Sequence, residues 1–166
     1  MKVLTPPQEV VITERVVVFL AGSIEMGTAN EWQQVAINLF DAMIPSAQKA
    51  DYLLLNPRRP DWNSSWKQEI NNPPFYEQVK WELNGLQQAT HIILYLDPAT
   101  KSPVSLLELG AFHNKAIVIC PDGFWRKGNV DIFCKEFNVQ QVPDLQSAVE
   151  LIVGPSAHIE ILPKNA

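Results

Sequence analysis

The sequence is short of positive charge, of cysteine and of long apolar runs, and each shortage excludes a class of protein. Its 13 lysine and arginine residues are outnumbered by 18 acidic residues. The net charge of -5 argues against a broad surface for a nucleic acid polymer, which needs a positive excess. Two isolated cysteines, Cys120 and Cys134, are too few for a structural zinc site, and we expect them to be reduced, buried thiols.

The longest aliphatic run, residues 16–21, is too short to span a membrane. The first ten residues, MKVLTPPQEV, lack the apolar stretch of a secretory signal. We therefore expect a cytoplasmic protein without a membrane partner. Neither a GxGxxG nor a GxxxxGK[ST] motif is present, which argues against the usual dinucleotide and Walker modes of binding. We expect neither a cofactor nor a metal ion.

Apolar runs and amphipathic segments alternate along the chain. The runs predict strands at residues 15–22, 51–57, 91–97 and 115–121, with weaker edge candidates at 157–162 and 9–13. Helical spacing predicts helices at residues 29–43, 75–89, 103–114 and 144–153. This alternation predicts one three-layer α/β domain over residues 1–166, with a doubly wound, mainly parallel, five-stranded sheet of the Rossmann or flavodoxin type.

Several residues predict how these helices begin and which face they bury. Thr28 and Glu31 are spaced as a capping box, and Ser102 and Asp144 are candidate N-caps. Pro103 suits the first position of a helix. In the second helix, the apolar stripe that we expect to face the sheet consists of Phe75, Val79, Leu83 and Leu86.

Ligands of such sheets bind beyond the carboxyl ends of the strands, so the residues after each run are the candidate site. After the first strand, Gly22 and Ser23 predict either an anion-binding loop or a plain turn. After the second come Arg58, Arg59, Asp61, Trp62 and Trp66. They either bind a phosphate and a base, or pair among themselves and cover the loop.

The third strand is followed by Asp97 and then by a helix with one charge among apolar neighbours, Glu108. A buried carboxylate must either be paired, here with Arg58 or Lys101, or be used chemically. If Leu107 and Ala111 pack on the sheet, Ser105 and Glu108 share a face toward the crevice. We also expect the helix N-terminus at Ser102 to favour the ionised form of Glu108.

The segments FLAGSI, WELNGLQQATHIILYLD and SLLELG, in this order, resemble the nucleoside 2-deoxyribosyltransferase superfamily. NPRR, a tryptophan-containing loop and GFWRKGNVDI resemble a deoxyribosyltransferase-like branch of it. The resemblance implies the roles that follow. Glu108 matches the nucleophile, Asp97 the acid that handles the leaving base, and Glu82 an aspartate that touches sugar or base. Gly22, Ser23 and Ile24 match the loop around the sugar or its phosphate.

The resemblance also implies a small-molecule nucleoside or nucleotide as substrate and a homo-oligomer as the assembly. Ser102 stands where the transferases carry an aspartate, which favours a phosphorylated substrate. The chemistry expected is cleavage or transfer of an N-glycosidic bond through a covalent glycosyl-enzyme. Val104 and Leu106 replace glycines of the family pattern. They motivate one alternative, a non-catalytic nucleotide-binding module. A redox flavoprotein on the same fold is a third option.

Overall fold

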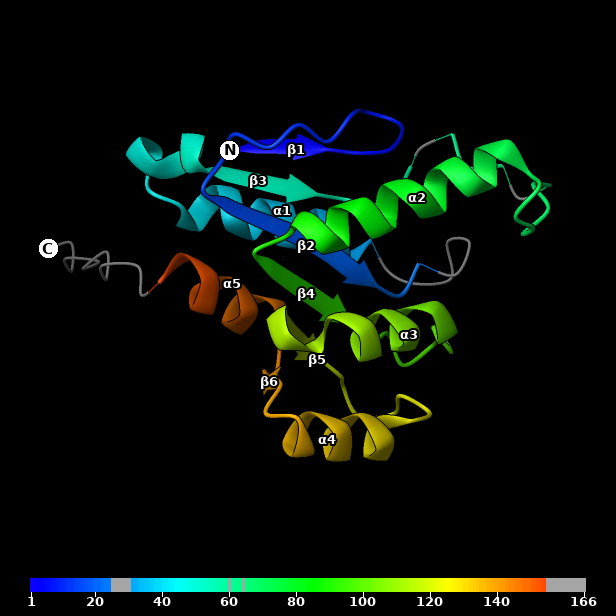
Figure 1. Ribbon diagram of the computed structural model, residues 1–166. Coiled ribbons are helices and arrows are strands. Elements are labelled where there is room, and N and C mark those ends of the chain that lie inside the picture. Colours follow the sequence, from blue (N-terminus) through cyan, green and yellow to red (C-terminus); the bar gives the residue numbers. More distant parts are fainter. Residues whose placement is uncertain (25–30, 60, 64, 155–166) are drawn as a thin grey trace, which may run out of the picture.

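The computed structural model has a parallel sheet between two layers of helices (Figure 1), and it describes residues 1–24, 31–59, 61–63 and 65–154. The six strands run in the order β1-β3-β2-β4-β5-β6. All neighbouring strands are parallel. Their bounds are β1 Lys2–Leu4, β2 Val16–Gly22, β3 Tyr52–Leu55, β4 His91–Tyr95, β5 Ala116–Ile119 and β6 Gln140–Gln141.

The four central strands confirm the prediction from the apolar runs, whereas the edges of the sheet differ from it. The sheet has six strands instead of five, because the short strands β1 and β6 pair at its two edges. Residues 9–13 were wrongly predicted as a strand: β1 occupies that edge, and Val10 and Ile12 pack against the core from a loop. The candidate strand at residues 157–162 lies outside the described residues.

The helices divide between the two faces of the sheet (Figure 1). Helices α1 (Trp32–Met43) and α5 (Leu145–Val153) cover one face, while α2 (Pro73–Gln88), α3 (Pro103–Phe112) and α4 (Lys127–Glu136) cover the other. Two 3₁₀ helices, η2 (Ser46–Asp51) and η3 (His113–Lys115), lead into β3 and β5. None of the described helices is long and apolar enough to cross a bilayer.

The predicted N-caps fared unequally. Asp144 caps α5 as predicted, because its carboxylate accepts a hydrogen bond from the backbone N–H of Ser147 at 2.8 Å. Helix α1 begins later than predicted: its N-cap is Glu31, which makes no side-chain cap bond, and Thr28 lies outside the described residues. Ser102 precedes α3 but does not cap it with its side chain, because its hydroxyl is bonded elsewhere.

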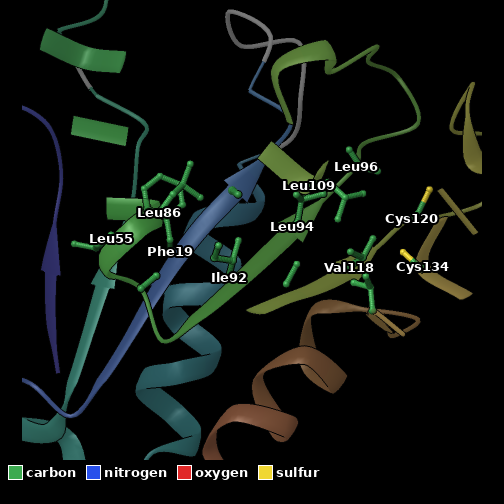
Figure 2. Packing of buried hydrophobic residues seen from close by; sticks show 14 of the residues in the cluster. Phe19, Leu55, Leu86, Ile92, Leu94, Leu96, Leu109, Val118, Cys120 and Cys134 are labelled. Atoms are coloured by element: carbon green, nitrogen blue, oxygen red, sulfur yellow. The ribbon is translucent and has the colours of Figure 1, made fainter. Parts of the chain in front are cut away.

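Helix α2 buries a face that only partly matches its predicted apolar stripe: Leu86 is buried as predicted, and Phe75 and Val79 are half-buried. Leu83 is 42% exposed, whereas the buried residues are Gln78, Gly85 and Leu86. Leu86 packs beside Phe19 and Leu55 in the larger apolar cluster (Figure 2). A Cβ at Gly85 would lie 2.8 Å from the Phe19 ring, so the missing side chain lets α2 approach β2 closely. This rotation turns Gln78 inward together with Glu82, which is half-buried.

Helix α3 is likewise rotated away from the prediction. Leu107 is 74% exposed and Ala111 is also exposed, so neither packs on the sheet. Ser105 and Leu109, one turn apart, are the buried residues instead. Glu108 lies beside this buried line and is half-buried.

The expectation for the cysteines is confirmed: Cys120 and Cys134 are buried and free, and both belong to the larger apolar cluster (Figure 2). Burial raises the pKa of each thiol to about 11.

Candidate active site

The order in which the chain adds strands to the sheet reverses between β2 and β4, which are parallel neighbours at the centre of the sheet. Helix α1 leads from β2 to β3 on one side, and α2 then crosses to β4 on the other. Open α/β sheets bind ligands in the crevice at such a switch point, beyond the carboxyl ends of the strands. The candidate site is therefore the region that follows Gly22 and Tyr95.

Gly22 is required at this edge by a close backbone contact. Its φ is +134°, and a Cβ at this position would lie 2.1 Å from the carbonyl oxygen of Tyr95. The next residue, Ser23, donates its backbone N–H to the same oxygen at 2.9 Å. Ile24, which follows, is half-buried. The missing side chain of Gly22 thus lets the backbones at the ends of β2 and β4 lie in direct contact.

Three buried hydroxyl groups, those of Ser23, Thr100 and Ser102, form a hydroxyl cluster at this junction. The Thr100 oxygen lies 2.8 Å from that of Ser23 and 2.7 Å from that of Ser102. The Ser23 and Ser102 oxygens are 2.5 Å apart. Ser23 also accepts the backbone N–H of Asp97 at 2.8 Å. The hydroxyl cluster therefore holds the β4–α3 loop against the end of β2.

Ser102 has an uncommon backbone conformation directly before α3. Its φ is 45° and its ψ is 52°, in the left-handed region, and it precedes Pro103. A residue before proline ordinarily adopts an extended conformation, so this geometry costs free energy that its surroundings must repay. Strain of this kind concentrates at functional sites, which supports this junction as part of the candidate site.

Glu82 on α2 and Glu108 on α3 form an acidic pair, because the charge of Glu82 acts on Glu108. Gln78 connects Glu82 to the carbonyl oxygen of Pro57, beyond the carboxyl end of β3. Burial, and then the charge of Glu82, raise the pKa of Glu108 to about 8. Burial also raises the pKa of Glu82, against a hydrogen bond from Gln78 that lowers it. The two carboxyl groups therefore interact across the helices, although they are distant in sequence.

No cation neutralises Glu108 within the described part of the chain. Arg58, one of the two candidate partners, instead forms an ion pair with Glu31 at 3.2 Å. No ion pair between described residues includes Glu108, so pairing with Lys101 is also excluded there. Of the two interpretations of this carboxylate, chemical use is the one that the ion pairs leave open.

The expectation that the helix N-terminus keeps Glu108 ionised is wrong for this structure. Glu108 is the sixth residue of α3, and the favourable field of a helix N-terminus falls off within the first turn. Burial and the neighbouring carboxylate outweigh it, so that most of Glu108 is protonated at pH 7.

Asp97 lies two residues beyond the end of β4 and organises the turn there. Its carboxylate accepts the backbone N–H of Ala99 at 2.9 Å, and its carbonyl accepts that of Thr100 at 3.0 Å. Asp97 is only 4% exposed. Its charge contributes to the raised pKa of Tyr95, after the effect of burial. The structure thus places Asp97 at the switch point, where it supports the turn that carries the hydroxyl cluster.

The loop after β3 contains internal pairs. Arg59 binds Asp61 through two hydrogen bonds of 2.8 Å, and its guanidinium stacks over Trp66 at 4.9 Å. Trp62 packs edge-on against Trp66 with 5.2 Å between ring centroids. For Arg59 and Asp61, these contacts match the interpretation in which the residues of the loop pair among themselves. Arg58 instead connects the loop to the start of α1 through Glu31.

Sequence reasoning missed two residues of this region. Thr100 lies at the centre of the hydroxyl cluster, yet as a single threonine in a loop it gave no signal. Gln78 is 4% exposed and donates to Glu82 at 2.7 Å. Its spacing of four residues from Glu82 on one helix could have indicated this contact.

In the described residues, no group of three His, Cys, Asp or Glu side chains is placed to hold a metal ion. The donors at the switch point are hydroxyl and carboxyl groups. They suit hydrogen bonding to a sugar, proton transfer and attack on an electrophilic carbon.

Together, these features define a doubly wound, parallel α/β protein whose candidate site, the hydroxyl cluster with the acidic pair, lies at the switch point of the sheet. A profile of the family described as nucleoside 2-deoxyribosyltransferase like matches residues 15–124, well over half of the chain. The chain therefore belongs to this family, as its motifs indicated. The matched range extends from the start of β2 beyond β5 and includes the hydroxyl cluster and the acidic pair. No curated protein matches the chain.

Proposed function

We propose that this protein cleaves the N-glycosidic bond of a nucleoside or nucleoside monophosphate, with Glu108 as the nucleophile. One observation carries the proposal: Glu108 is half-buried beside Glu82 and has no neutralising cation among the described residues. Such a carboxyl group destabilises the folded state. A role in the reaction that this protein catalyses best explains why the chain carries it.

The acidic pair can supply both the nucleophile and the acid of this reaction. At neutral pH the pair holds a proton, mainly on Glu108. Transfer of this proton to Glu82 leaves Glu108 ionised. A Glu108 oxygen then attacks the anomeric carbon, the bond to the base breaks, and its electron pair goes to the base nitrogen. Glu82 protonates that nitrogen, and the sugar remains as an ester of Glu108.

The ester is then resolved by an acceptor. Water gives a free sugar in a hydrolase, and a second base gives a new nucleoside in a transferase. In both cases Glu82 takes the proton of the acceptor, which restores the starting state of the pair. The hydroxyl cluster and the loop from Gly22 to Ile24 border the place where the sugar or its 5′-phosphate binds. Arg58, Asp61, Trp62, Ser102 and Ser105 stay candidates for contacts with phosphate or base.

The test is release of free base from a panel of ribo- and deoxyribonucleosides and their monophosphates, followed by chromatography. Wild type is compared with Glu108→Gln, which keeps the shape but cannot form the ester. Glu136→Gln, an exposed carboxylate on α4, is the matched control. We expect Glu108→Gln to lose at least about 10³-fold in kcat and Glu136→Gln to lose nothing. An active Glu108→Gln contradicts the proposal.

A non-catalytic nucleotide-binding module is the second candidate, favoured by the predominantly protonated state of Glu108 at pH 7. Such a module binds a nucleotide of the panel by calorimetry but releases no base after long incubation. Release of base by wild type excludes it. Family membership also motivates the expectation of a homo-oligomer, which light scattering tests: a monomer at micromolar concentration contradicts it.

A further inference from the structure

Gln78 is a buried amide whose hydrogen bonds fix its orientation. Its Nε2 group donates to the carbonyl oxygen of Pro57 at 3.0 Å and to Oε1 of Glu82 at 2.7 Å. A reversed amide would direct its oxygen at two other oxygens, so only the observed orientation is favourable. Pro57 holds the amide through the backbone at the end of β3, independently of Glu82. The amide therefore presents a fixed donor to this one carboxylate.

This arrangement carries a cost in the folded protein. The Oε1 atom of Gln78 is buried and has no hydrogen-bond partner among the described residues. An unpaired buried acceptor destabilises the native state. A methionine of similar size would fill the same space without that cost. The two N–H groups of Gln78, rather than its packing, distinguish it from such a residue.

The acidic pair is asymmetric because of this donor. Glu82 accepts a hydrogen bond from Gln78, which favours its ionised form. Glu108 has no hydrogen bond with any residue of the described ranges, and it faces the charge of Glu82. The proton of the pair consequently belongs on Glu108.

The other charged groups around the pair do not offset this asymmetry. Glu108 is the only titratable residue of α3, and β2, which both helices contact, has none. On α2, Glu77 and Lys80 are exposed. The loops that follow β3 and β4 add further charged residues. Arg58 binds Glu31, Arg59 binds Asp61, and the others are the exposed Lys67 and Glu69 together with Asp97 and Lys101.

We propose that Gln78 is a positioning residue that holds Glu82 in its ionised form and thereby assigns the proton of the acidic pair to Glu108. The use of this proton in catalysis rests on the proposed function, but the assignment itself is a property of the unliganded protein. Gln78 also connects the acidic pair to Pro57, the residue before Arg58.

The experiment is a carboxyl ¹³C NMR titration of the full chain labelled at glutamate, with the two signals assigned through Glu82→Gln and Glu108→Gln. In wild type at pH 7 we expect the larger share of the proton on Glu108. In Gln78→Met, we expect the midpoint of Glu82 to rise by about one pH unit and that of Glu108 to fall. Gln88→Met is the matched control, because Gln88 makes an exposed bond of 2.7 Å to Asn84 on the same helix.

Unmoved midpoints in Gln78→Met, or a wild-type proton that lies mainly on Glu82, overturn the proposal. If Gln78→Met does not fold, the wild-type measurement and Gln78→Asn, whose amide is too short to reach both acceptors, decide it. The NMR result does not require turnover, so a protein without glycosidase activity can still confirm the assignment. Where a substrate is found, Gln78→Met should shift the acid limb of the kcat/KM profile while Gln88→Met leaves it in place.

Discussion

The hydroxyl cluster and the acidic pair are two polar groups at the same edge of the sheet, and they are built differently. In the hydroxyl cluster, the oxygens of Ser23, Thr100 and Ser102 bond to one another and to the backbone of Asp97. In the acidic pair, only Glu82 has a hydrogen bond, and Glu108 has neither a donor nor a cation among the described residues. Hydroxyl groups with hydrogen-bond partners stabilise the folded state. A buried carboxyl group without a partner, such as Glu108, destabilises it, which is typical of a residue kept for a chemical role.

The largest predicted change in stability comes from replacing Glu108 by a neutral residue. The pKa of Glu108 is about 8 in the folded protein and near the ordinary 4.5 when unfolded. Between these values the folded state binds more protons than the unfolded state, so this group's contribution to stability falls as pH rises from about 4.5 to about 8. Glu108→Gln should therefore gain up to roughly 5 kcal/mol in the free energy of unfolding at pH 8.5, because each pKa unit between the folded and unfolded states corresponds to about 1.4 kcal/mol.

Urea unfolding of wild type and Glu108→Gln at pH 5 and pH 8.5 measures this gain, which should be small at pH 5. Glu136→Gln serves again as the exposed control. An equal gain at both pH values would show that packing rather than ionisation is responsible.

A substitution in the hydroxyl cluster should lower the free energy of unfolding instead of raising it. Thr100→Val keeps the shape of the side chain but removes the hydroxyl that contacts both Ser23 and Ser102. The two serines lose a buried partner, and the free energy of unfolding should fall by roughly 1 to 3 kcal/mol. Thermal or urea unfolding should show a similar loss at pH 5 and pH 8.5, because no charge is involved. Thr13→Val, at an exposed position, should change little.

The smallest effect sharpens the description of the acidic pair. Glu82→Gln removes the charge that raises the pKa of Glu108 after the larger effect of burial. The titration midpoint of Glu108 should therefore fall by about one pH unit, yet stay above 4.5 because burial persists. Carboxyl NMR measures it directly. A midpoint that stays near 8 would mean that the two carboxyl groups do not interact.

The prediction of structure from sequence succeeded where one requirement dominates. A central parallel strand is buried on both faces and must be apolar throughout. The apolar runs in the sequence therefore predicted the strands β2 to β5 correctly. The edge strands β1 and β6 are short and are selected by pairing with β3 and β5, which no local pattern reports. The inner faces of α2 and α3 were predicted only in part, because Leu83 and Leu107 lie exposed while Gln78 and Ser105 are buried.

The sequence alone determined three features, because each is a local pattern of residue types. They are the chain order of strands and helices, the position of Glu108 beyond the third central strand, and the family motifs. Tertiary structure decided the rest. It brought Glu82 and Glu108 together from two helices, joined Ser23 to Thr100 and Ser102, and set Gln78 against one carboxylate. Protonation depends on burial and on neighbouring charges in space, so the proposal that Glu108 holds the proton of the acidic pair could come only from the folded arrangement.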